Sequence, residues 1–248
     1  MRQVFLIAWR EYRQYVFSRG FLIFLVMLPL SMIAFSAAIG FAERTKPVRA
    51  FAVYDETGRY VDHIDREVER RQKLIAIAAW DEYVSFHASA GAIADGQIAE
   101  PFAPGDINDS RLRAFEAAGG FAAAEKAAAP FLKSGAPDFV APRGVFERVA
   151  LPGHAATAAS VGEAEEALRP FLMGEIGVRR SDGGVAPLFA AVLIPADFGP
   201  AEDAPAAQYW SRNLTDTALE DLVDSALDSA LKREAAERYG LPQERLED

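Results

Sequence analysis

The stretch FLIFLVMLPLSMIAFSAAIGF, residues 21–41, decides how the chain is organised. Its 21 residues contain no ionisable side chain, although 25% of the whole chain is charged. A helix rises about 1.5 Å per residue, so a helix of this length spans the roughly 30 Å hydrocarbon core of a bilayer. Pro29 is tolerated in such a helix because neighbouring groups can satisfy the freed backbone carbonyl. We therefore predict a transmembrane helix over residues 21–41.

Two other interpretations of this stretch remain open. A cleaved signal peptide would place Gly40 and Ala42 at the small-residue positions of a cut after Ala42. However, the apolar region of a signal peptide is usually only about 7–15 residues long. A buried helix of a soluble domain rarely continues so far without a charge. We favour the uncleaved anchor.

The charges on the two sides of the apolar stretch are opposite in sign. Residues 1–20 hold four arginines against Glu11, a net charge of +3, so residues 42–248 must carry −13 to give the total of −10. Cytoplasmic flanks of membrane spans are enriched in Lys and Arg. The N-terminus is therefore predicted in the cytoplasm, and residues 42–248 in the periplasm or the extracellular space.

Residues 1–20 are predicted to form an amphipathic helix in the headgroup plane of the membrane. Trp9 and the tyrosines would be its interfacial anchors. The alternative is a basic flank that only sets the topology. The prediction depends on apolar residues that recur at roughly helical spacing, namely Val4, Phe5, Ile7, Ala8, Tyr12, Tyr15 and Val16.

The composition excludes several classes of site. The chain has no cysteine, which excludes disulfides, thiolate zinc sites, iron–sulfur clusters and cysteine nucleophiles. The only histidines, His63, His87 and His154, are far apart in the sequence, so we expect no metal site. An acidic chain does not favour phosphate contacts, and we expect no nucleic-acid partner.

Residues 42–248 are predicted to form one small mixed α/β domain outside the membrane. Strands that alternate with helices favour some parallel pairing. Residues 75–140 are Ala-rich and punctuated by Pro and Gly, so we interpret them as an α-rich insertion, with a low-complexity linker as the alternative. Strands are predicted at 50–54, 145–151, 188–194 and 208–211, and helices at 60–71, 108–133, 162–173 and 217–239. The helix over 108–133 is expected to be weakened at the Gly119-Gly120 pair.

The string Asp55-Glu56-Thr57-Gly58 has some likeness to a catalytic motif. Aspartyl-phosphate pumps have Asp-Lys-Thr-Gly-Thr and aspartic proteases have Asp-Thr-Gly or Asp-Ser-Gly, but here Glu56 interrupts both patterns. Asp, Thr and Gly at the end of a strand are also ordinary turn residues. We interpret the string as a turn and predict no catalytic residue.

The order of several short motifs resembles that of the ABC-2 type transporter permeases, in their sodium-exporter-like branch. The resemblance covers about residues 1–60 and 160–245, whereas residues 75–140 do not fit it. The motifs are AWREY at 8–12, SRGFL at 18–22, LPL at 28–30, VYDETG at 53–58, AAVLIPADF at 190–198 and YWSRN at 209–213.

The resemblance implies a non-catalytic permease subunit of an export system in the inner or plasma membrane. The subunit would be a homodimer or pair with a partner permease. ATP would be bound by a separate cytoplasmic ATPase subunit and not by this chain. Permeases of this kind have about five further spans after the exterior domain, so we expect a truncated or split permease, or a relic that holds only the first span and the exterior domain. The resemblance places the ATPase contact at Trp9, Arg10, Glu11, Tyr12 and Arg13.

Two other functions remain as alternatives to the permease. The first is a single-span exterior binding or sensor module without a transport role. The second is a membrane-tethered hydrolase, which would require a nucleophile–base arrangement that the sequence does not display. Loss of activity on mutation of Asp55 would be its test. The sequence does not identify the substrate of an exporter, and sodium, a drug, a lipid and a peptide all remain open.

Overall fold

The chain separates into two units, Met1–Pro47 and Val48–Asp248. The computed structural model describes residues 48–201, 203–213 and 215–239, and in the first unit only residues 9, 20, 21, 23–25, 27, 28 and 31. The helices predicted over 1–20 and 21–41 thus lie mostly outside the described residues. Within the described part of the chain, no helix is both long and apolar enough to cross a membrane.

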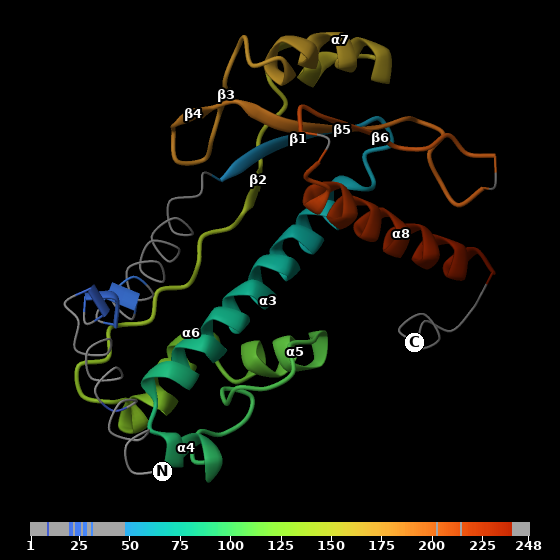
Figure 1. Cartoon of the computed structure of the whole chain (residues 1–248). Coiled ribbons are helices and arrows are strands. Elements are labelled where there is room, and N and C mark those ends of the chain that lie inside the picture. The colour runs from blue at the N-terminus through green and yellow to red at the C-terminus, as the bar shows by residue number, and fades with distance from the viewer. Residues whose placement is uncertain are drawn as a thin grey trace. The chain divides into compact units, whose positions relative to one another are not determined.

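A four-stranded sheet forms the centre of the second unit (Figure 1). The strand order is β2 (Phe146–Arg148), β1 (Arg49–Asp55), β5 (Leu188–Ile194) and β6 (Gln208–Ser211). β1 is parallel to both β2 and β5, and β6 is antiparallel to β5. β1 and β5 are apolar runs because both of their faces are buried. The predicted mixed α/β fold with parallel pairing is confirmed.

Helices cover both faces of this sheet (Figure 1). α3 (Val61–His87) and α8 (Ala218–Tyr239) pack on one face, where their side chains join Phe51 and Val192 in one core. α7 (Val161–Leu172) and the 3₁₀ helix η2 (Gly153–Thr157) cover the other face over a second core. The sheet is therefore the middle of three layers.

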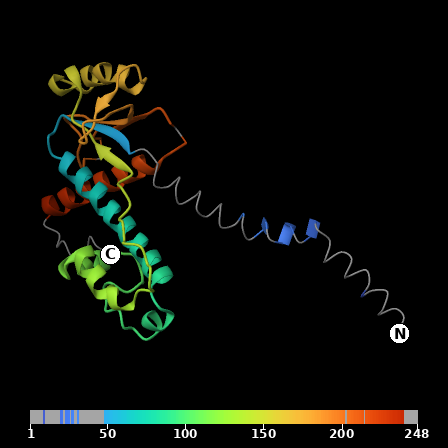
Figure 2. The same cartoon turned by 90° about the vertical axis from the view of Figure 1, so that its left-hand side faces the viewer.

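α3 extends well beyond the sheet, as Figures 1 and 2 both show. Its 27 residues span about 40 Å, whereas the seven residues of β1 span roughly 23 Å. From Leu74 onward, α3 packs against α4 (Ala90–Ala94), α5 (Asp109–Ala117), α6 (Gly120–Ala128) and the 3₁₀ helix η1 (Ala129–Phe131) over a third core. We call this part of the fold the tip lobe.

Two element boundaries differ from the sequence predictions. The helix predicted over 60–71 continues to His87, because Ile77, Trp80 and Val84 extend the buried stripe into the tip lobe. The helix predicted over 108–133 is fully divided at the glycine pair that was expected to weaken it, because the φ of +105° at Gly119 does not fit a right-handed helix.

The remaining strands were partly foreseen. The structure places strands at 188–194 and 208–211, as predicted, and a shorter one within 145–151. A small hairpin of β3 (Val178–Arg179) with β4 (Val185–Ala186) was not predicted. Two-residue strands are too short to produce a detectable alternation of polar and apolar residues.

Candidate functional site

The carboxyl ends of β1 and β5 bring two of the quoted motifs together. In open α/β sheets, ligands bind outside the carboxyl ends of the strands where the strand order reverses. β1 occupies this position because β2 and β5 flank it. Here the Glu56 backbone N–H donates to the Ile194 carbonyl at 3.0 Å, and Glu56 Oε2 accepts from Ala196 N at 3.0 Å. We call this region the carboxyl edge.

The Asp55 carboxylate forms the turn at this edge. Its Oδ1 accepts from Thr57 N at 3.0 Å and from Thr57 Oγ1 at 2.7 Å. Its Oδ2 accepts from the backbone N–H groups of Tyr60 and Val61, at 2.7 and 3.3 Å, where α3 begins. Oδ1 therefore holds a backbone and a side-chain donor of the turn and Oδ2 holds two backbone donors, which confirms the turn interpretation.

Tyr60 and Arg59 close the carboxyl edge against α8. The buried Tyr60 hydroxyl donates to Glu234 Oε2 at 3.0 Å, and its ring meets Phe198 edge to face at 4.9 Å. Arg59 donates to Glu234 Oε1 and to the Phe198 carbonyl, both at 3.1 Å. Burial, and then the hydrogen bond with Glu234, raises the pKa of Tyr60 to about 12. The region where the fold rule places a ligand is thus filled by internal contacts.

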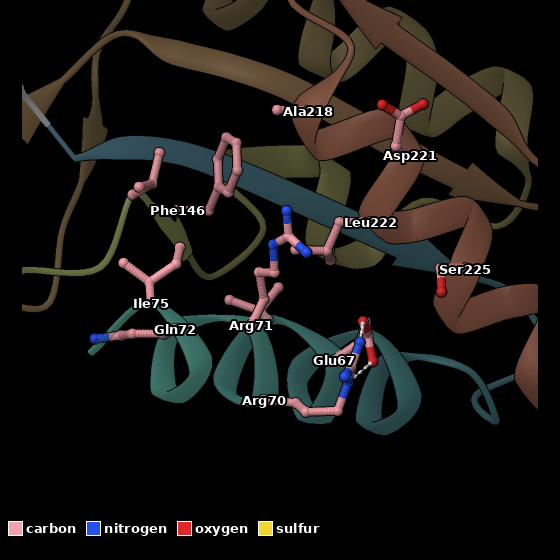
Figure 3. Close-up of a pocket in the computed structure, with 12 residues that line it drawn as sticks. Glu67, Arg70, Arg71, Gln72, Ile75, Phe146, Ala218, Asp221, Leu222 and Ser225 are labelled. Atoms are coloured by element: carbon pink, nitrogen blue, oxygen red, sulfur yellow. Dashed lines mark hydrogen bonds and ion pairs between the residues drawn. The ribbon is translucent and has the colours of Figure 1, made fainter. Parts of the chain in front are cut away.

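A pocket of about 370 Å³ lies between α3, β2 and α8, at the opposite end of the sheet from the carboxyl edge (Figure 3). Its volume is within the range of about 300–1,000 Å³ that small-molecule sites occupy. It forms beside the part of α3 that passes from the sheet into the tip lobe, and beside the first turns of α8. The lining residues are Glu67, Val68, Arg70, Arg71, Gln72, Ile75, Val145, Phe146, Ala218, Asp221, Leu222 and Ser225.

The two arginines that line the pocket differ in their pairing. Arg70 Nε donates to Glu67 at 2.7 Å and Arg70 Nη1 donates to Asp109 at 2.7 Å. The hydrogen bond with Glu67 is the main cause of a raised Arg70 pKa. Arg71, by contrast, has no hydrogen-bond or ion-pair partner among the residues that the structure describes. Figure 3 shows its guanidinium reaching between Phe146 and Leu222.

α8 contributes polar groups to the opposite wall of the pocket. Asp221 Oδ2 accepts from the Thr217 hydroxyl at 3.1 Å, and Ser225 follows one turn later. Asp221 has no basic partner within the described ranges. Among the described residues, the pocket therefore combines apolar walls with one cation and one anion that have no oppositely charged partner, an arrangement that can bind and orient a small molecule.

This pocket was not predicted from the sequence. Val68, Arg71, Gln72 and Ile75 follow the i, i+3, i+4, i+7 spacing that places them on one face of α3. This spacing was a usable signal for a shared face. It could not show that β2 and the start of α8 approach that face, because they come from distant parts of the sequence.

The predicted ATPase contact stays a prediction. Trp9 is helical and 57% exposed. Arg10, Glu11, Tyr12 and Arg13 lie outside the described residues. In the part of the chain that the structure describes, no group of three or more His, Asp or Glu side chains is placed to hold a metal ion.

Comparisons with protein-family models, with curated proteins and with solved structures each return no match.

Proposed function

We propose that this chain is a permease subunit, or the N-terminal part of one, in an ATP-driven export system of the ABC-2 type. The observation that carries the proposal is the contact between the VYDETG and AAVLIPADF motifs. Their strands pair in parallel from Phe51↔Ala190 to Asp55↔Ile194, and Glu56 joins the two turns that follow. Two motifs that are far apart in the sequence thus form one framework. This arrangement supports the proposal that both belong to the exterior domain of an ABC-2 type permease.

The exposed apolar residues of the first unit support the membrane part of the proposal. The described residues Phe21, Ile23, Phe24, Leu25, Met27 and Leu28 are helical and 41–62% exposed. Exposed apolar side chains at this density suit a lipid environment better than water. In the proposal, residues 21–41 span the bilayer and residues 42–248 are exterior. A second copy or a partner permease supplies the other spans, and ATP binds to a separate subunit.

Single-cysteine variants of the full chain test the topology, because the natural chain has no cysteine. Asp197→Cys introduces a thiol at an exposed position of the carboxyl edge, and Gln3→Cys introduces one before the apolar stretch. A membrane-impermeant maleimide applied to intact cells is expected to label only Asp197→Cys. Gln3→Cys should react after the membrane is permeabilised. Equal labelling of both variants in intact cells would contradict the predicted span.

The partnership with an ATPase needs a separate experiment. The full chain is purified from its own membranes, and ATP hydrolysis by the preparation is measured. We expect hydrolysis that falls when Arg10→Glu or Glu11→Lys reverses a charge at the predicted contact. Arg2→Glu is the matched control, since it reverses a charge on the same segment outside that contact. A preparation without ATP hydrolysis, or one equally affected by all three variants, argues against the export role.

The pocket between α3, β2 and α8 favours a second candidate function, the single-span binding or sensor module. In that case the chain works without an ATPase. The intact mass of the native protein helps to separate the two candidates. A mass well above that of the 248 residues means that further spans follow and favours the permease. A mass that matches the 248 residues favours the binding module.

A further inference from the structure

We infer that the pocket between α3, β2 and α8 binds a small apolar carboxylate, and that Arg71 holds its carboxylate group. The inference supplies a ligand class for a pocket to which neither the motifs nor the comparisons assign a role. It concerns the described residues of the second unit only. Its failure would therefore leave the proposed export role unaffected, and failure of the export role would leave the inference intact.

Charge complementarity selects an anion as the ligand. Arg70 is already occupied by Glu67 and Asp109, so it is not available to a ligand. Arg71 projects into the pocket without a partner among the described residues, and it is solvent-exposed, so a ligand can reach it without opening the fold. A guanidinium pairs with a carboxylate through two parallel N–H···O bonds, and such charge-assisted pairs are stronger than neutral hydrogen bonds.

The walls of the pocket require the rest of the ligand to be apolar. Ile75 of α3 faces Phe146 at the start of β2 and Leu222 of α8 across the cavity (Figure 3), and Val68 also lines it. Ile75 is 39% exposed and Val145 is 42% exposed. An apolar chain or ring between these walls removes this surface from water. The volume of about 370 Å³ limits the ligand to a small molecule.

The acidic groups of the pocket select a single negative charge. Glu67 is neutralised by Arg70, but Asp221 has no cationic partner in the described ranges. A phosphate dianion would be attracted by the positive charge of Arg71, but the negative charge of Asp221 would repel it. A carboxylate carries only one charge and can turn its apolar part toward the α8 wall. The pocket therefore favours a monoanionic carboxylate over a phosphate ester.

Photolabelling of the full chain in lipid nanodiscs tests the inference, with empty nanodiscs as the background. The probe is a decanoic acid derivative that carries a diazirine, and its primary amide is the neutral comparison. Labelled peptides are identified by mass spectrometry, and affinity is measured by competition with unlabelled decanoate and with decyl phosphate. The variant is Arg71→Gln. The matched control is Arg66→Gln, which removes the same charge from an exposed position of α3 that does not line the pocket.

We expect the acid probe to label peptides from the middle of α3 and the start of α8. Arg71→Gln should weaken the acid by about tenfold or more, the ratio expected for the loss of a charge-assisted pair. It should leave the amide unchanged, and Arg66→Gln should change neither probe. Decyl phosphate should compete less well than decanoate. Labelling spread over other peptides, equal loss of acid and amide in Arg71→Gln, or stronger competition by decyl phosphate would each overturn the assignment.

Discussion

Replacement of Arg111 by alanine is expected to unfold the tip lobe while the sheet stays folded. Arg111 is 11% exposed and its partner Asp81 on α3 is 14% exposed. The two form a bidentate pair with both N···O distances at 2.6 Å. The same guanidinium donates to the carbonyls of Pro101, Ala103 and Gly105, at 3.1, 2.7 and 3.0 Å. One side chain thus ties α5 to α3 and to the loop between α4 and α5.

The size of the effect follows from these contacts. Removal of one partner of a buried ion pair costs about 3–5 kcal/mol, because the remaining charge is left unpaired. Each of the three carbonyls also loses a donor, worth about 1 kcal/mol where water does not replace it. Water can enter beside a pair that is 11–14% exposed, so we expect a total loss of about 3–5 kcal/mol. Such a loss exceeds what a lobe with a small core of its own can sustain.

Hydrogen exchange measured by mass spectrometry on the full chain is the assay. Arg111→Ala should remove amide protection in α5 and α6 and leave the protection of β1 and β5 unchanged, since the cores of the sheet do not include the tip lobe. Arg113→Ala is the control, because Arg113 is exposed on the same helix. Equal loss of protection in the two variants, or a parallel loss in β1 and β5, would refute the reasoning.

Three further predictions concern single positions. Asp55→Ala removes the acceptor of four hydrogen bonds at the carboxyl edge, so urea unfolding should show a loss of about 2–4 kcal/mol, with a smaller loss for Asp55→Asn. The pKa of Tyr60 is raised from its ordinary value of 10.0 to about 12 in the folded state, so its stabilising contribution is complete below pH 10 and is lost as the pH rises toward 12. Alkaline unfolding curves should show a smaller loss of stability between these pH values for Tyr60→Phe. Gly119→Ala places a side chain at a φ of +105°, where it also meets the Ala123 methyl group at 3.0 Å, and it should lower the melting temperature of the tip lobe through a cost of about 1–3 kcal/mol.

The parts of the fold that the sequence predicted well are those with a strong local pattern. β5 is a run of seven residues that are almost all buried, stopped by Pro195, and its bounds coincide with the prediction. α8 carries an apolar stripe from Leu219 to Ala230 that fixes which of its faces packs on the sheet. The turn at Asp55 was also predicted, because the donors that its carboxylate accepts are only two to six residues away.

The parts that the sequence did not predict depend on contacts between distant segments. The end of α3 was missed because Ile77, Trp80 and Val84 serve a different core from Ile64, so the stripe changes partners within one helix. The pocket was missed for a related reason. Its walls come from three elements, and the unpaired state of Arg71 becomes visible only when the partners of Arg70 are known.

Because α3 is one continuous helix, the two cores of the second unit that it joins are mechanically coupled. The first turns of the helix belong to the core shared with α8, and its last turns belong to the core of the tip lobe. An α-helix resists bending, so a rotation of the tip lobe must also move the turns that pack on the sheet, or separate them from it. The pocket lies beside the part of α3 that passes from one core to the other. A molecule wedged there would fix the angle between the two cores.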